Sequence, residues 1–132
     1  MNCLDTSVLI DYLEGEASVG EFVESHDREP LFAPTPALQE VFIGAVRARG
    51  DDGLERVRSD LDWVEPIDLT IDTAAEAARI DGELHAAGEP IGPLDTLIAG
   101  VVRHANGTIV TRDNHFTRVD GLDVELIGAE KS

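Results

Sequence analysis

The sequence predicts an α/β fold in which a central, mainly parallel sheet lies between two layers of helices. Short apolar segments alternate with longer helical stretches, which is the order expected when helices connect parallel strands. A chain of 132 residues with 42% hydrophobic content is long enough to bury one substantial core. It contains no repeat, low-complexity tract or linker. We therefore expect a single three-layer α/β/α domain over residues 1–132.

The expected strands are short runs of apolar and β-branched residues, and the expected helices have longer patterns of helical period. The strands are Asn2–Leu4, Leu31–Ala33, Trp63–Glu65, Thr108–Thr111 and Val124–Ile127. The helices are Ser7–Leu13, Val19–His26, Pro36–Arg49, Asp52–Leu61, Thr73–Ala87 and Pro93–Asn106.

Several helix ends carry their own signals. Thr35 followed by Pro36 predicts an N-cap and a first helical position. Thr73 with Glu76 predicts a capping box, and Gly88 predicts a C-terminal stop.

Cysteine and histidine content argues against a zinc site. Cys3 is the only cysteine, so we expect a buried small hydrophobic residue in the first strand. The four histidines show no metal-ligand spacing. The chain begins without a signal-like segment and has no apolar run of membrane-spanning length, so we expect a soluble, cytoplasmic protein without a membrane partner.

Net charge is −17, from 27 acidic and 10 basic residues. Such a charge repels a polyanion in dilute buffer. The acids are spread along nearly the whole chain, and nine of the ten bases are Arg, with Lys131 the only Lys. This pattern is typical of a halophilic surface, because molar salt shortens the screening length to about 3 Å. The net charge is therefore better evidence of a high-salt environment than of the kind of partner that the protein binds.

Three nearly uncharged stretches each contain one acid. They hold Asp5 within residues 1–10, Glu40 within 36–46 and Asp95 within 90–102, and none of the three contains Lys or Arg. An ionised carboxylate in an apolar setting is unfavourable unless a cation or hydrogen bonds compensate it. The pattern predicts a metal ion bound by oxygen ligands, such as Mg²⁺ or Mn²⁺.

Each acid also has a simpler interpretation. Asp5 directly follows the first strand, where ligands of parallel sheets bind, but it also suits an N-cap. Asp113 follows the fourth strand, yet a turn aspartate paired with Arg112 fits as well. Asp95 in a first helical turn would gain about 0.3–1 kcal/mol from the helix dipole. Glu40 lies in mid-helix without a cation three or four residues away, which favours a functional role.

The four acids gain weight when they are taken together. Carboxylates brought into one cleft repel each other by a few kcal/mol per close pair. Two divalent ions about 3.5–4 Å apart can hold both the attacking water and the leaving oxygen of a phosphodiester displacement. Hydrolysis of nucleic acid is therefore the chemistry that this arrangement favours.

The segments that carry these acids resemble PIN-domain ribonucleases, and most closely the VapC-type toxins of type II toxin-antitoxin pairs. They are residues 4–11 (LDTSVLID), the helical Glu40, residues 93–99 (PLDTLIA) and residues 111–116 (TRDNHF). Their order and spacing and the chain length all match, and the resemblance covers essentially the whole chain. It implies a PIN-like α/β/α fold, Mg²⁺- or Mn²⁺-dependent endoribonuclease activity, a homodimer, an RNA substrate and a cognate antitoxin that blocks the site.

The resemblance places Asp5, Glu40, Asp95 and Asp113 on the acidic quartet of the family. It implies that Asp5 and Asp95 are the principal metal ligands, that Glu40 binds metal or orients its water, and that Asp113 is a weaker or second-metal ligand.

Hydroxyl groups from Thr6, Ser7 and Thr111 are expected to orient the ligating carboxylates. Ser7 departs from the family, which commonly has Asn there. Asp11 belongs to the first motif, but we expect it to be a surface or salt-bridging residue rather than a ligand.

Possible RNA contacts are few. Arg112 is the best candidate, because it lies beside Asp113. Arg47 and Arg49 belong to a group with Arg56 and Arg58 that suits phosphate binding and pairing with nearby acids equally well. The Ala-rich stretch 74–78 permits close helix packing, either at a dimer interface or within the monomer.

Three other classes of protein also place acids at strand ends. Haloacid-dehalogenase phosphatases and phospho-receiver domains use a positioned Lys, whereas Lys131 is next to the C-terminus. Such a phosphatase also needs an Asp at position 7, which is Ser. The alternative that stays open is a non-catalytic PIN-like module that binds RNA or protein without cleavage.

Overall fold

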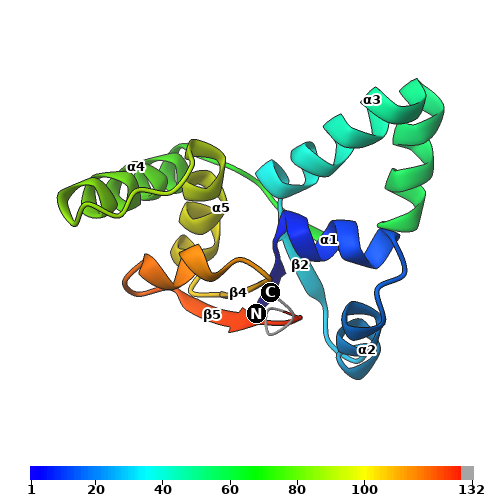
Figure 1. Ribbon diagram of the computed structural model, residues 1–132, viewed down its shortest axis with the longest axis horizontal. Coiled ribbons are helices and arrows are strands. Elements are labelled where there is room, and N and C mark those ends of the chain that lie inside the picture. Colours follow the sequence, from blue (N-terminus) through cyan, green and yellow to red (C-terminus); the bar gives the residue numbers. More distant parts are fainter. Residues whose placement is uncertain (129–132) are drawn as a thin grey trace.

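The computed structural model describes residues 1–128 and contains a five-stranded parallel sheet (Figure 1). The strand order is β3-β2-β1-β4-β5. The strands are β1 (Asn2–Leu4), β2 (Leu31–Pro34), β3 (Glu65–Ile67), β4 (Thr108–Thr111) and β5 (Asp123–Leu126). Because β1 is central and pairs with both β2 and β4, the segments that follow these three strands emerge at one edge of the sheet.

Five α-helices cover the sheet. They are α1 (Thr6–Leu13), α2 (Ala17–Ser25), α3 (Thr35–Asp60), α4 (Ile71–Ala86) and α5 (Pro93–His104). Figure 1 shows α1, α2 and α3 on one side of the strands and α4 and α5 on the other. A 3₁₀ helix, η1 (Asn114–Arg118), joins β4 to β5. The predicted three-layer α/β/α fold is confirmed. Within the described range, no helix is both long enough and apolar enough to cross a membrane.

The two helices expected between residues 36 and 61 are two arms of α3, which bends sharply at Arg49 and Gly50. Gly50 has a φ of 62°, a conformation that favours glycine. Past the bend the arms touch closely, because a Cβ on Gly53 would lie 2.7 Å from the Ala45 carbonyl oxygen. Beyond this point of contact the two arms of α3 diverge, and Figure 1 shows them as an open V.

The predicted bounds of the third and fifth strands were partly wrong. Its strand is Glu65–Ile67, two residues later than expected, because Trp63 packs edge-on against Tyr12 at 4.8 Å and donates its Nε1–H to the Asp60 carbonyl. The fifth strand also begins one residue earlier than expected, at Asp123.

The predicted capping box on Thr73 and Glu76 is wrong as well. Thr70 is the N-cap of α4 and exchanges reciprocal hydrogen bonds with Thr73. Thr35 is the first residue of α3, and Pro34 takes the N-cap position expected of Thr35. Gly88 does follow the end of α4, with a φ of 73°, as predicted.

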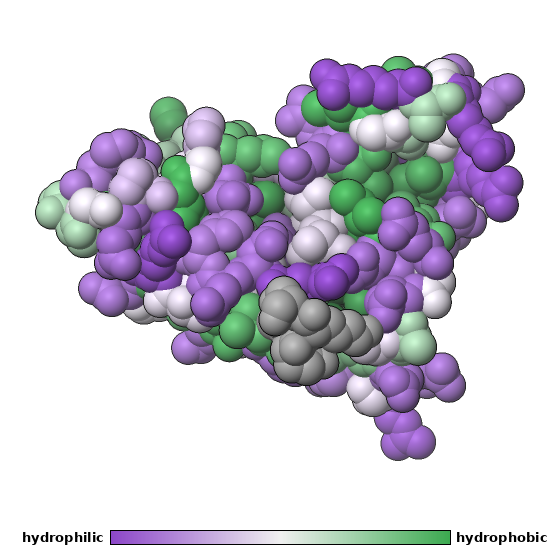
Figure 2. Space-filling model, viewed as in Figure 1, coloured by the Kyte–Doolittle hydropathy of each residue, from purple (hydrophilic) through white to green (hydrophobic). Residues whose placement is uncertain are grey.

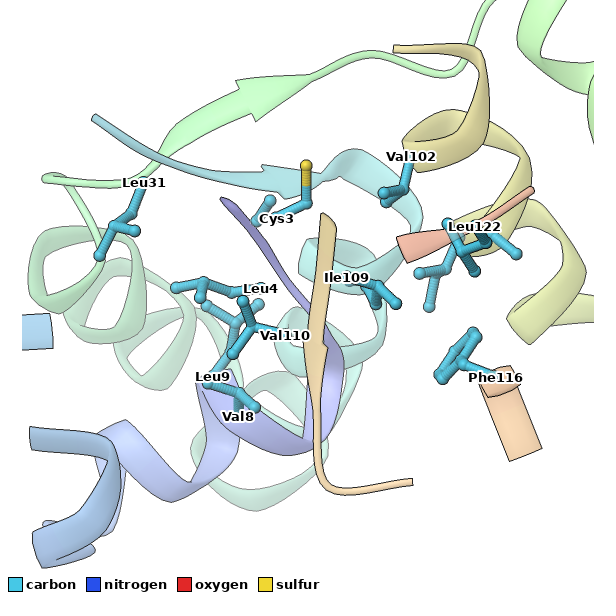
Figure 3. Close-up of a cluster of buried hydrophobic side chains, with 14 of the residues drawn as sticks. Cys3, Leu4, Val8, Leu9, Leu31, Val102, Ile109, Val110, Phe116 and Leu122 are labelled. Carbon is cyan, nitrogen blue, oxygen red and sulfur yellow. The ribbon is translucent and has the colours of Figure 1, made fainter. Parts of the chain in front are cut away.

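The central core joins the two strands that carry the candidate acids (Figure 3). Cys3 and Leu4 of β1 and Ile109 and Val110 of β4 are fully buried. Burial raises the pKa of the Cys3 thiol to about 11, so it stays protonated as a small apolar side chain, as predicted. This packing fixes the register of β1 and β4, and therefore the positions of the residues that follow them.

Helices α4 and α5 approach each other closely. A Cβ on Gly100 would lie 2.7 Å from the Cβ of Ala77, so only glycine fits at this crossing. At least this alanine of the Ala-rich stretch therefore serves packing within the monomer. Lys131, singled out above, lies outside the described residues.

Candidate functional site

Asp5 directly follows β1 and is 1% exposed. It stands at the N-cap position of α1, but its side chain makes no capping hydrogen bond. Instead, Oδ2 accepts hydrogen bonds from Thr111 Oγ at 2.7 Å and from Ser7 Oγ at 3.3 Å. Oδ1 is buried and has no hydrogen-bond partner among residues 1–128. The carboxylate is therefore held at one oxygen and left open at the other.

Burial raises the pKa of Asp5 to about 6. The hydrogen bonds from Thr111 and from the Thr6 backbone oppose this rise, while the charges of Asp113 and Asp95 add to it. Asp5 is therefore partly protonated in slightly acidic solution when nothing positive compensates it.

Asp95 lies in the first turn of α5, after the N-cap Gly92. Burial raises its pKa too; His115 opposes the shift, and Asp113 and Glu40 reinforce it. Asp95 thus has the first-turn position that the sequence predicted, while its interaction with the helix dipole stays a prediction.

Glu40 and Asp113 complete the group but are less enclosed. Glu40 is exposed on the first arm of α3, and Asp113 is half-buried before η1. The Thr111 hydroxyl accepts a hydrogen bond from the Asp113 backbone N–H at 2.9 Å, so Thr111 joins Asp113 to Asp5.

The structure thus brings all four acids to one edge of the sheet, close enough for their charges to interact. Within residues 1–128, none of them forms an ion pair with Arg or Lys. Also within that range, no three His, Cys, Asp or Glu side chains converge tightly enough to ligate an ion alone. The cluster is an open one, and within the described residues His115 beside Asp95 is its one possible side-chain cation partner.

Arg112 pairs with a different acid from the one considered above. Its Nη1 donates to Asp11 Oδ2 at 2.7 Å, not to Asp113. Asp11 is buried, at 8% exposure, so the expected salt bridge of Asp11 exists but lies under the surface. The Arg112 backbone N–H also contacts Ser7 Oγ at 3.4 Å. This pair anchors the loop after β4 to α1.

The remaining predicted residues lie outside the acidic contacts. The Thr6 hydroxyl is buried without a partner. Arg47 and Arg49 are exposed near the bend of α3. Of the acids expected to pair with the arginine group, Asp60 meets Arg56 at 4.0 Å.

Sequence reasoning missed His115. Its Nε2 lies 3.0 Å from Asp95 Oδ2, although twenty positions separate the two residues. No helical or strand spacing relates them, because one belongs to α5 and the other to η1. The available signal was the position of His115 two residues after Asp113, in the loop that leaves β4.

Residues 3–122 match the family model described as PIN domain. The chain is 29% identical over 125 residues to a tRNA(fMet)-specific endonuclease VapC of Shigella flexneri, covering 92% of this chain and 94% of the relative. It is 31% identical over 93 residues to the protein of the same name in Salmonella typhimurium, covering 67% and 68% of the two chains.

Solved structures with the same fold include VapBC2 from Rickettsia felis bound to a promoter DNA fragment, with a TM-score of 0.87 at 22% identity, covering 96% of this chain and 98% of that one. DNA-bound VapBC from Salmonella typhimurium has a TM-score of 0.84 at 24% identity, covering 94% and 96%.

Proposed function

Because this chain belongs to the PIN-domain family, we propose that it is a divalent-metal-dependent endoribonuclease that acts as the toxin of a toxin-antitoxin pair. The observation that carries the proposal is the buried, unpartnered Asp5 Oδ1 at the centre of four acids that no Arg or Lys of residues 1–128 neutralises. The endonuclease names of the curated relatives support the same activity.

The donor set fits a hard divalent ion, Mg²⁺ or Mn²⁺. Such ions prefer carboxylate oxygens, and Mg²⁺ is commonly held by one or two carboxylates with water completing its shell. An open cluster with one oriented carboxylate meets that requirement. We assign Asp5 and Asp95 as principal ligands, Glu40 as a ligand or an orienter of water, and Asp113 as the weaker or second-ion ligand.

Hydroxyl groups keep the assigned ligands in place. Thr111 fixes both the Asp5 carboxylate and the backbone of Asp113, and Ser7 supports Asp5 more weakly. When bound, a divalent ion neutralises charge on the scissile phosphate and activates water for in-line displacement. Among residues 1–128, no Arg or Lys forms an ion pair with these acids, and only His115 lies against one of them, Asp95.

Transfer RNA is the first substrate to test, since both curated relatives are named for it. Arg112, with a 36% exposed side chain, lies next to Asp113 and is placed to contact RNA beside the acids. Arg47 and Arg49 are further proposed contacts from α3.

A cognate antitoxin would cover the site through the hollow between α1 and the arms of α3. This hollow has a volume of about 260 Å³ and is lined by Glu14 and Glu40 together with apolar side chains. Its lining includes Ile10, Leu13, Val41, Ala45 and Val57. Figure 2 shows apolar surface gathered there. An apolar partner segment that carries a cation would bury this surface and neutralise Glu40 at once.

Three further properties belong to the proposal. Exposed apolar side chains on α3, Ile43 and Val46, support a homodimer that joins two sites. The charge of −17 supports a halophilic surface. A cytoplasmic location fits a toxin that acts on RNA.

The decisive experiment treats total RNA with antitoxin-free protein in high-salt buffer and maps the ends of the products. We expect cuts at a few defined sites with Mg²⁺ or Mn²⁺, none with chelator, and none with Asp95→Asn. Saturating metal should also raise the Tm, because it binds only the native state. Absence of both cleavage and a Tm shift would favour the non-catalytic module.

A further inference from the structure

His115 and Asp95 meet side by side at the acidic edge. Nε2 and Oδ2 are 3.0 Å apart, and the two side chains are 27% and 31% exposed. The Nε2 atom itself is buried. The imidazole ring also rests against Phe116, with ring centroids 4.6 Å apart, and Phe116 is fully buried. The core therefore holds the ring with its Nε2 toward the acids.

The contact is short, and His115 opposes the rise in the pKa of Asp95. Nε2 has no hydrogen-bond partner in the described structure, although Asp95 Oδ2 is within reach. Nε2 is therefore a buried nitrogen that lies beside the Asp95 carboxylate, at the border of the acidic edge.

The separation of the two atoms also fits a shared ion. Two neighbouring ligands of an octahedral ion with bonds of about 2.1 Å lie about 3.0 Å apart, and each points at the ion rather than at the other. Asp113 and Glu40 add negative charge to the same space, since both act on Asp95.

The other histidines have no such position. His26 and His85 contact carbonyl oxygens of their own helices through Nδ1, and His104 is exposed at the end of α5. His115 is thus the one imidazole among residues 1–128 that borders the acidic cluster.

We propose that His115 is a nitrogen ligand of the catalytic ion, next to Asp95. This inference rests on the proposed nuclease function and deepens it by naming the metal preference. Imidazole nitrogen bonds more strongly to first-row transition ions than to Mg²⁺, which prefers oxygen. His115 therefore shifts the site from Mg²⁺ toward an ion such as Mn²⁺.

Paramagnetic Mn²⁺ provides the direct test on the full chain. Electron spin echo modulation from bound Mn²⁺ should show coupling to one imidazole ¹⁴N, and the coupling should change to the ¹⁵N pattern in protein made with ¹⁵N-histidine. The coupling should disappear in His115→Gln and persist in His104→Gln, the matched histidine variant. The isotope exchange uses the wild-type chain, so the test stands even if His115→Gln does not fold.

Metal affinities give a second readout that needs no cleavage. In competition titrations, His115→Gln should weaken Mn²⁺ binding by about tenfold or more and Mg²⁺ binding by clearly less. His104→Gln should change neither.

The outcomes separate the two proposals. Mn²⁺ that binds the wild-type chain without nitrogen coupling would overturn the ligand role of His115 and leave the nuclease proposal intact. Mn²⁺ that remains entirely free in solution would overturn both.

Discussion

Two clusters of charged side chains in this molecule have opposite electrostatics. At the junction of α4 and α5, Arg103 donates to Glu76 at 2.6 Å and to Glu83 at 2.9 Å. There the hydrogen bond from Arg103 lowers the pKa of Glu76. At the carboxyl edge of the sheet, burial instead raises the pKa of Asp5 to about 6 and also raises the pKa of Asp95.

The difference shows which acids serve the fold. Arg103 also donates to the Asp120 carbonyl, so its cluster ties α4, α5 and the segment before β5 together. The acids at the sheet edge form no ion pair with Arg or Lys within residues 1–128, and their mutual repulsion destabilises the metal-free protein. Acids kept in so unfavourable a state are best explained by a ligand that compensates them.

The largest expected effect comes from a substitution among the four acids at the sheet edge. Asp95→Asn removes a proposed ligand and should lower cleavage by at least about a hundredfold, measured by product end-mapping and initial rates. The Tm of the metal-free variant should equal or exceed the wild-type value, because a buried, repelled charge is gone.

Asp72→Asn is the matched control. Asp72 lies in the first turn of α4, as Asp95 does in that of α5, so both variants lose the same helix-dipole interaction. Wild-type cleavage by Asp95→Asn, or equal losses in both variants, would contradict the assignment.

Removing Arg103 should have the opposite effect, which is a loss of stability without a loss of cleavage rate. Arg103→Met leaves Glu76, whose side chain is 18% exposed, without its main partner and should reduce the free energy of unfolding by about 2 kcal/mol. The rate per folded molecule should not change. Urea titration and active-site-normalised kinetics measure the two quantities.

Arg79→Met tests whether losing any arginine partner of Glu76 has the same effect on stability. Arg79 contacts the same carboxylate at 2.9 Å but is 66% exposed, so its loss should change stability by less than about 0.5 kcal/mol. Similar losses from both arginine variants would mean that burial of Arg103 contributes little.

The sequence predicted the cluster of acids at the sheet edge but not the cluster around Arg103, and the reason is physical. Asp5 and Asp113 each follow a strand, and a parallel sheet gathers strand ends at one edge, so pattern and topology together predict their meeting. The lone acid Asp95 in its apolar helix was added by the resemblance to the family. Arg103 lies 27 residues from Glu76, and no local period relates them. Glu76 was therefore assigned to a capping box.

The same limit explains the remaining differences. Arg112 reaches Asp11 across 101 positions, and His115 reaches Asp95 from another element. Such contacts depend on the crossing of elements, which a single sequence does not encode locally. The strands β1 and β4 were predicted to the residue, because each is a short segment around buried apolar side chains.

A pH titration sharpens the comparison. The Asp5 pKa is raised from 3.8 to about 6 on folding, so the folded state binds the proton more tightly. The resulting stability is full below pH 3.8 and is lost as pH rises through about 6. Glu76, with a lowered pKa, has the opposite effect, but only below its unfolded value of 4.5.

Between pH 5 and 7, metal-free protein should therefore lose about 1 kcal/mol of stability through Asp5. Urea unfolding in chelator at several pH values measures this slope. Asp5→Asn should flatten it, and saturating Mn²⁺ should reverse it by favouring the ionised form. A slope that Asp5→Asn leaves unchanged would assign the effect to other groups.

The smallest expected effect concerns the exposed acids, which belong to neither cluster. At a net charge of −17, lowering salt from 1 M to 0.1 M lengthens the screening distance from about 3 to about 10 Å and strengthens repulsion across the surface. Stability should fall by less than about 1 kcal/mol in wild type, measured by urea unfolding at both salt concentrations.

Asp95→Asn should reduce this loss only slightly, since one of 27 acids is removed. If Asp95→Asn abolished the salt dependence, repulsion would be concentrated at the sheet edge, and the surface would not be halophilic. Equal stability at both concentrations would refute the halophilic interpretation and leave the acidic edge as the only place where charge destabilises the fold.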